Sequence, residues 1–105
     1  MRTKLSTWNG GSGFEYERDA DGTIVVYYGE RCEYSVFLDA PLYDQLIRTF
    51  AGKAIRVNHC LAEENIEDWL TKNGTRAGGS QYVAPILLHE RYAGEGPRRG
   101  TIKFR

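Results

Sequence analysis

The chain contains no long apolar run and few cysteines, and each absence argues against a class of protein. No segment of the 105 residues approaches the roughly 20 consecutive apolar residues that a membrane-spanning helix needs. Residues 1–13 hold charge, glycine and one tryptophan where a secretory signal would have an apolar stretch. We therefore expect a cytoplasmic protein without a membrane partner, in which Cys32 and Cys60 remain reduced thiols.

Motifs for common enzymatic chemistry are also missing. The chain has no Walker loop, no dinucleotide fingerprint and no zinc-protease helix motif. A catalytic alternative would use Cys60 as a nucleophile with His59 or His89 as its base. Another would pair His89 with Glu90 as acid and base. Neighbours in sequence often point apart, so spacing alone does not support either arrangement.

A metal site is the third chemical alternative. The residues with the right chemistry for a two-Cys, two-His zinc site are Cys32, His59, Cys60 and His89. Adjacent His59 and Cys60 cannot easily both face one ion, and the other two ligands would come from distant single positions. We therefore expect no metal, no cofactor and no enzymatic activity.

Charge is divided unevenly along the chain, although the formal total is zero. Residues 1–71 hold seven Lys and Arg against twelve Asp and Glu, whereas residues 72–105 hold seven against two. The two parts therefore carry about minus five and plus five charges. This division favours either contact between the basic part and nucleic acid, or association between oppositely charged parts of two copies. With 41% hydrophobic residues and single-domain length, residues 1–105 are expected to form one globular domain.

The first part of the chain predicts a β-meander. Residues 1–13 are glycine-rich and are expected to be a flexible lead-in. Residues 14–38 contain three β-branched or alternating runs separated by turn residues, which predicts three antiparallel strands. Aromatic side chains recur along these runs at Tyr16, Tyr27, Tyr28, Tyr34 and Phe37.

These aromatic residues have two interpretations. Stacking on single-stranded nucleic acid is one, but the neighbouring glutamates make that face electronegative, which repels phosphate. We expect most of the rings to be core. Any ring that remains exposed would indicate a protein partner.

Helical patterns begin after the meander. Asp39 is expected to cap a helix with Pro41 in its first turn, because a proline there loses no intrahelical hydrogen bond. The stripe of Leu42, Leu46 and Phe50 supports this helix. Residues 54–58 then alternate apolar and polar side chains, which predicts a short strand.

Two further helices are expected. Asn65 is a capping residue for the second, and Asp68 three residues later completes an imperfect capping box. The third helix is expected to begin at Ser80 or Gln81, which places Pro85 near its fourth position. A strand over residues 86–89 is the alternative.

The order of these elements over residues 42–105 resembles a winged helix-turn-helix. The resemblance implies that the helix from Gln81 enters the DNA major groove, with Arg98 and Arg99 at the tip of a hairpin wing. Other basic residues could neutralise backbone phosphates. The candidate nucleic-acid contacts are Lys72, Arg76, Gln81, Arg91, Arg98, Arg99, Lys103 and Arg105.

Together these patterns predict one α+β domain. A three-stranded antiparallel meander at residues 14–38 precedes a winged-helix-like half at residues 41–105, with about three helices and a closing edge strand. The expected function is a small non-enzymatic protein-binding or self-assembly module, with a homodimer or another protein as partner. Nucleic-acid binding by the basic C-terminal third is the alternative, and a cysteine- or metal-dependent enzyme is a remote one.

Overall fold

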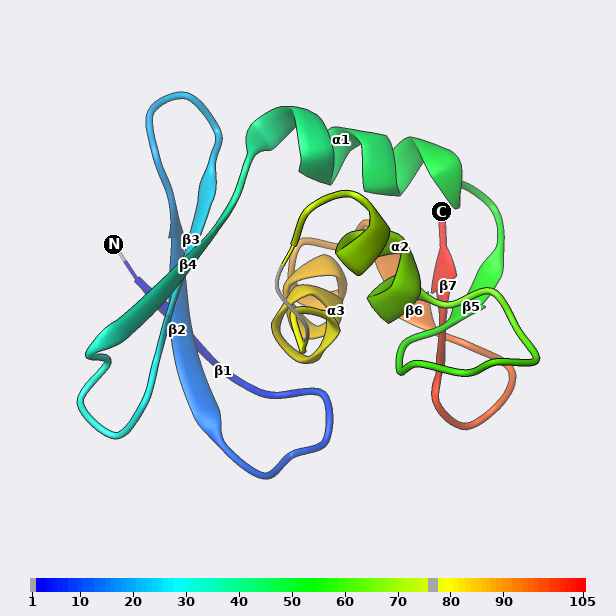
Figure 1. The fold of residues 1–105 in the computed structure, drawn as a ribbon, viewed down its shortest axis with the longest axis horizontal. Coiled ribbons are helices and arrows are strands. Elements are labelled where there is room, and N and C mark those ends of the chain that lie inside the picture. The colour runs from blue at the N-terminus through cyan, green and yellow to red at the C-terminus, as the bar shows by residue number, and fades with distance from the viewer. Residues whose placement is uncertain (1, 76–77) are drawn as a thin grey trace.

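Three helices lie between two antiparallel sheets in the computed structural model, which describes residues 2–75 and 78–105 (Figure 1). The first sheet contains β1 (Thr3–Ser6), β2 (Gly13–Arg18), β3 (Ile24–Tyr28) and β4 (Tyr34–Leu38). The helices are α1 (Ala40–Thr49), α2 (Ile66–Lys72) and α3 (Ser80–His89). The second sheet contains β5 (Ala54–Arg56), β6 (Ala93–Glu95) and β7 (Thr101–Phe104). The expected α+β class is confirmed.

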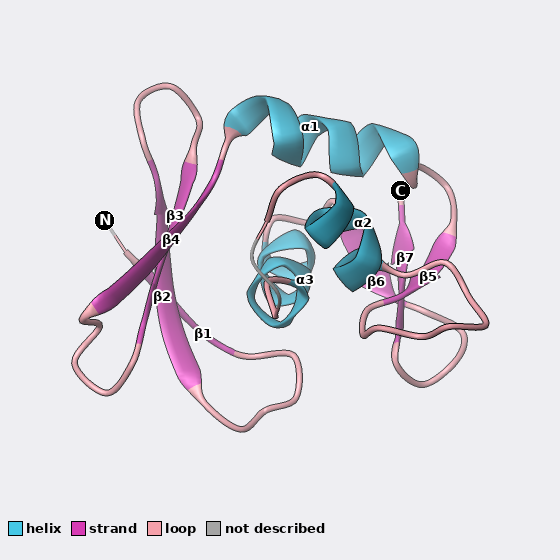
Figure 2. Ribbon diagram, in the orientation of Figure 1, coloured by secondary structure: helices cyan, strands magenta, loops and turns pink. Residues whose placement is uncertain are grey.

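The first sheet is a meander of four strands, one more than the sequence predicted (Figure 2). The additional strand, β1, pairs with β2 so that Leu5 lies opposite Phe14 and Thr3 opposite Tyr16. The prediction of a flexible lead-in is therefore wrong for residues 3–6. A strand of four residues has little periodicity of its own, and the cross-strand contacts that stabilise it come from β2.

The second sheet has the strand order β5-β7-β6. Its register places Ile102 of β7 opposite Ile55 of β5, and Phe104 of β7 opposite Ala93 of β6. The closing strand expected over residues 101–105 was predicted to lie at an edge, but β7 is the central strand. The error arose because β5 is separated from β7 by two helices, and local alternation does not show how many neighbours a strand has.

Local signals at the helix starts are only partly confirmed. Asn65 caps α2 as predicted, since its Oδ1 accepts the Asp68 N–H at 2.8 Å. Pro41 lies in the first turn of α1, but Asp39 makes no side-chain capping bond, so that part of the prediction is wrong. The third helix is confirmed, because α3 begins at Ser80 and ends at His89, but Pro85 lies in its interior and not near the fourth position, so that part of the prediction is wrong.

Glu67 of α2 supplies the cap that α3 lacks locally. Its Oε2 accepts the Gly78 N–H at 2.8 Å and its Oε1 accepts the Ser80 N–H at 3.1 Å. Burial works against the charged carboxylate, yet these backbone donors outweigh burial, so the pKa of Glu67 lies below its usual value. A side chain from one helix therefore fixes where the next helix begins.

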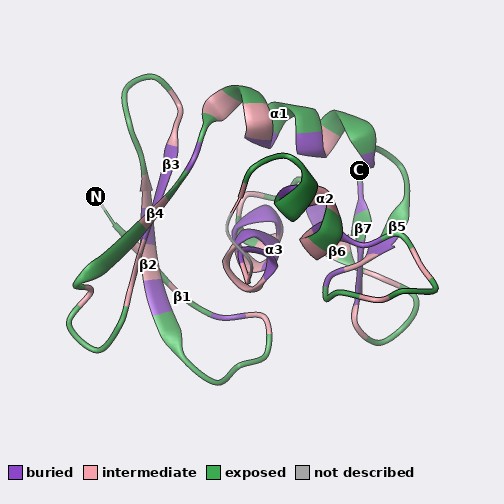
Figure 3. Cartoon of the chain, in the orientation of Figure 1, coloured by how far each residue is buried: buried purple, intermediate pink, exposed green. Residues whose placement is uncertain are grey.

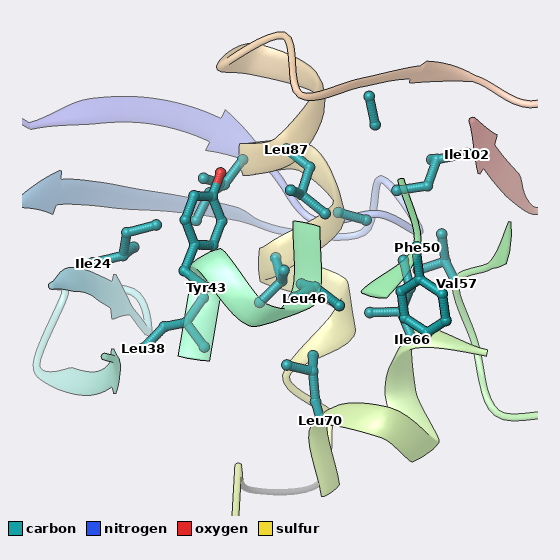
Figure 4. Close-up of a cluster of buried hydrophobic side chains, with 14 of the residues drawn as sticks. Ile24, Leu38, Tyr43, Leu46, Phe50, Val57, Ile66, Leu70, Leu87 and Ile102 are labelled. Carbon is teal, nitrogen blue, oxygen red and sulfur yellow. The ribbon is translucent and has the colours of Figure 1, made fainter. Parts of the chain in front are cut away.

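The core lies around α1 and α3, where both sheets meet the helices (Figure 4). From α3, Val83, Ile86 and Leu87 are buried. Figure 4 places Ile24 and Leu38 of the first sheet on one side of this cluster and Ile102 of the second sheet on the other. Leu46 of α1 lies among them and has no exposed surface.

Replacing Leu46 with alanine should lower the free energy of unfolding by about 2–5 kcal/mol, because it leaves a cavity in this core. Leu61 is the matched control, since it is a leucine that is 95% exposed. Leu61→Ala should change the free energy of unfolding by no more than about 0.5 kcal/mol. Urea unfolding curves measure both, and equal losses in the two variants would contradict the position of α1.

Candidate functional site

The outer edge of β4 is the least protected part of the first sheet. β1 and β4 are its two edge strands. Natural edge strands are usually protected by charge, proline or bulges, and β1 carries Lys4. β4 has no charged residue between Tyr34 and Leu38. Most of β4 is exposed in Figure 3.

The backbone groups of Ser35 and Phe37 point away from the sheet. In the β2–β3 turn, the Asp19 N–H donates to the Thr23 carbonyl oxygen at 2.8 Å. Antiparallel pairs alternate between bonded and non-bonded positions, so this bond fixes the alternation along β3 and β4. By that alternation Val36 exchanges hydrogen bonds with β3. The N–H and C=O groups on either side of it, at Ser35 and Phe37, are directed to the open edge.

Two aromatic rings remain exposed on this strand. Phe37 lies directly opposite Val25 of β3, yet Val25 is only 4% exposed and Phe37 is 61% exposed. Tyr34 is 56% exposed and stacks on Tyr28, with 5.3 Å between ring centroids. Tyr16 is buried, as expected of the core. Tyr27 and Tyr28 are only partly buried, so the prediction that most aromatic residues of the meander are core is wrong.

Polar contacts within the chain cover part of the outer face of the same sheet. The Arg2 guanidinium lies 3.5 Å from the centre of the Tyr27 ring and 3.8 Å from Glu15. The Tyr27 hydroxyl donates to Glu17 at 2.6 Å, and this bond to an acceptor raises the pKa of Tyr27. These groups on the face are thus paired within the chain, whereas no hydrogen bond between described residues occupies the outward backbone groups of the β4 edge.

The expected basic contacts are distributed over several elements. Lys72 ends α2, and Arg91 follows the end of α3 in the left-handed region, with φ of 65°. The residues that the structure brings to the C-terminal hairpin and the end of β7 are Arg98, Arg99, Lys103 and Arg105. Arg76 lies outside the described residues. The basic residues therefore gather only in part, at this hairpin and the end of β7.

Arg98 is already engaged by an acidic residue. Its Nη1 and Nη2 donate to the two carboxylate oxygens of Glu63 at 2.9 and 3.1 Å, and Arg56 Nε donates to the same carboxylate at 3.2 Å. The hydrogen bonds from Arg98 and then Arg56 lower the pKa of Glu63 to about 2. A phosphate would have to compete with Glu63 for Arg98, whereas Arg99 is exposed beside it.

The helix expected to read DNA is enclosed between the two sheets. Within α3 only His89 is exposed. The Trp8 N–H donates to the Gln81 carbonyl oxygen at 2.9 Å, and the Tyr82 ring packs edge-on against Phe14. Gln81 keeps partial exposure. A helix covered in this way does not favour insertion into a groove.

Cys32, His59 and His89 of the chemical alternatives each contact a different residue. Cys32 Sγ donates to Glu15 at 3.4 Å, and burial together with this bond raises the pKa of the thiol. His59 Nδ1 lies 2.6 Å from Asp68, and the His89 ring packs edge-on against Tyr16. Within residues 2–75 and 78–105, no three His, Cys, Asp or Glu side chains are grouped to hold a metal ion. The helices described there are also too short or too polar to cross a membrane.

A polar cluster centred on Glu90 joins α3 to the first sheet and α1. Glu90 accepts hydrogen bonds from Arg18 of β2, from the Tyr16 hydroxyl at 3.1 Å and from the Tyr43 hydroxyl at 3.1 Å. Burial, and then the charge of Glu90, raise the pKa of Tyr16 to about 12. The partners are far apart in sequence, so no local pattern predicted the cluster. Both carboxylate oxygens of Glu90 are engaged by these donors, which favours a structural role.

Comparisons of the chain with protein-family models, with curated proteins and with solved structures found no match. The geometry of the chain is therefore the basis for assigning a function. Its most distinctive feature is an uncharged strand edge with outward backbone groups and an exposed aromatic ring. In the sequence, the signal for this edge was the absence of charge between Tyr34 and Leu38.

Stability should depend on pH through Glu63. The folded-state pKa of Glu63 is lowered from 4.5 to about 2, so its contribution is present above pH 4.5 and disappears as the pH falls toward 2. Glu63→Gln should therefore reduce the loss of unfolding free energy between these pH values. Urea unfolding at a series of pH values measures the difference from the wild type.

Glu64→Gln is the control for this measurement, because Glu64 is an adjacent exposed carboxylate. It should leave the pH dependence close to that of the wild type. If Glu63→Gln had the same pH dependence as the wild type, this would contradict the ion pairs of Glu63 with Arg98 and Arg56.

Proposed function

We propose that this protein is a non-enzymatic protein-binding or self-assembly module whose contact element is the outer edge of β4. The observation that carries the proposal is the exposure of Phe37 beside the outward backbone groups of Ser35 and Phe37. An added strand would satisfy those groups with main-chain hydrogen bonds, and side-chain contacts with Phe37 would select the partner.

The alternatives on the same sheet support this choice. A ligand approaching the outer face would have to replace contacts among Arg2, Tyr27 and Glu17. The inner side of β4 is closed by α3 and the described part of the loop before it, which leave a crevice of only about 20 Å³. A strand added at the edge displaces neither set of contacts.

Ser35→Pro should abolish strand addition without unfolding the protein. Proline removes an N–H that points to solvent, which edge strands tolerate. Val36→Pro should instead lower the melting temperature strongly, because its N–H is directed to β3. Circular dichroism measures folding, and hydrogen exchange at the Phe37 amide measures protection by a bound strand.

The partners for this experiment are a second copy, supplied by raising the protein concentration, and a displayed library of extended peptides. Protection that is lost in Ser35→Pro supports the proposal. It would be overturned if neither partner protected the edge, or if Ser35→Pro and Val36→Pro destabilised the fold equally.

As a second candidate, we propose that the basic hairpin, formed by β6, β7 and the loop that carries Arg98 and Arg99, contacts nucleic acid. It is supported by the element order α1, β5, α2, α3, β6, β7 with β7 between its neighbours, which resembles a winged helix, and by exposed Arg99 and Lys103. Because α3 is enclosed, the contact would be to backbone phosphates and independent of base sequence. Glu63 would limit the part played by Arg98.

Duplex binding measured across a salt series tests this candidate. Arg99→Ala should reduce the magnitude of the salt slope by about 1, as expected for the loss of one phosphate contact. Arg31→Ala, in the loop between β3 and β4, is the matched control and should leave the slope unchanged. A wild-type slope near zero would exclude phosphate contact.

A further inference from the structure

We infer that the occupant of the β4 edge is a second copy of this chain, paired antiparallel about a twofold axis with Phe37 opposite Phe37 of the partner subunit. The inference rests on the proposed function of this edge and specifies its partner and register. It would join the two four-stranded sheets into one continuous sheet. The closed symmetry would leave neither β4 edge open for further addition.

The direction of the backbone groups restricts how two copies can pair. Inter-strand hydrogen bonds require outward groups on both strands, which in β4 are those of Ser35 and Phe37. A twofold axis also requires that, if one residue lies opposite a second residue of the partner subunit, the second lies opposite the first. Three registers meet both conditions and keep most of β4 paired. Their axes pass through Ser35, Val36 or Phe37.

Two of these registers bring unfavourable side chains together. With the axis at Val36, Glu33 lies directly opposite Asp39 of the partner subunit, and like charges at opposed positions are destabilising. With the axis at Ser35, the Phe37 ring faces Glu33 of the partner subunit. The Glu33 carboxylate already accepts the Arg31 N–H at 2.8 Å.

The register with its axis at Phe37 has no such conflict. The two Phe37 rings, each 61% exposed in the single chain, lie opposite one another on the outer face and form an aromatic cross-strand pair. Ser35 then faces Asp39 of the partner subunit, where the hydroxyl can donate to the carboxylate. The twofold axis repeats this contact at the other end of the strand.

Asp39 provides an independent reason to prefer this register. It occupies the N-cap position of α1, where aspartate usually accepts a helix N–H, but its side chain makes no capping bond. It is also exposed. A hydrogen bond from Ser35 of the partner subunit would give this carboxylate a role that no contact among the described residues gives it.

A charge exchange at Phe37 tests both the partner and the register. Phe37→Lys and Phe37→Glu each place like charges at the axis, so each variant alone should associate at least roughly tenfold more weakly than the wild type. An equimolar mixture places lysine opposite glutamate and should restore the dimer. Sedimentation equilibrium over a concentration range measures all four samples, and circular dichroism confirms that each variant is folded.

Leu61→Lys and Leu61→Glu are the matched controls, because they make the same changes at an apolar residue that is 95% exposed outside β4. They should leave association unchanged both alone and mixed. A wild type that remains monomeric up to millimolar concentration would overturn the inference. So would a dimer that Phe37→Lys and Phe37→Glu leave intact, or one that the mixture does not restore.

Single cysteines identify the register directly when Cys32 and Cys60 are first replaced with serine. Residues that lie directly opposite each other in antiparallel strands and exchange backbone hydrogen bonds have Cα atoms about 5.5 Å apart. This separation is within the range that a disulfide spans. With oxidised glutathione, Phe37→Cys should form covalent dimers faster than Ser35→Cys or Val36→Cys, which would report the other two axes. Faster cross-linking at either of those positions would overturn the proposed register.

The displayed peptide library separates this inference from the proposed function. If the chain stays monomeric but extended peptides protect the Phe37 amide in a manner that Ser35→Pro abolishes, the second copy is excluded and the binding edge stands. If neither a second copy nor a peptide binds, both are overturned.

Discussion

The enclosure of α3 between the two sheets is the constraint on which the rest of the structure depends. Its apolar side chains fill the space where the sheets and α1 meet, so both sheets share one core. Two carboxylates hold its ends. Glu67 of α2 binds the amides at its start, and Glu90 just after its end binds Arg18, Tyr16 and Tyr43. Both are paired in geometries that offset the cost of partial burial.

This enclosure also determines which surfaces remain for a partner. The inner sides of both sheets are covered by helices, and the outer face of the first sheet is satisfied by its own contacts around Tyr27. Glu63 forms an ion pair with Arg98 and so reduces the positive charge that the hairpin presents to a partner. The edge of β4 is different, because neither a charged side chain nor a described strand covers its outward backbone groups.

Predictions from sequence succeeded where the stabilising contact is local. The cap of α2 by Asn65, the strands of residues 14–38 and the helix with Leu46 in its stripe depend on residues a few positions apart. They failed where the contact is distant. β1 is held by its pairing with β2. β7 is central because it pairs with β5, which precedes α2 and α3 in the chain. Asp39 has the residue type of a cap but makes no such bond.

The features of the candidate site also divide into those set by local sequence and those set by contacts between distant residues. The sequence by itself determined that residues 34–38 form an uncharged strand and that basic residues concentrate in the last third, because both follow from composition and period. Only the tertiary structure decided that this strand lies at an edge, that Phe37 stays exposed and that Arg98 is paired with Glu63. The physical reason is that strand neighbours, burial and ion pairs join residues distant in the chain, and local propensity carries no record of those distances.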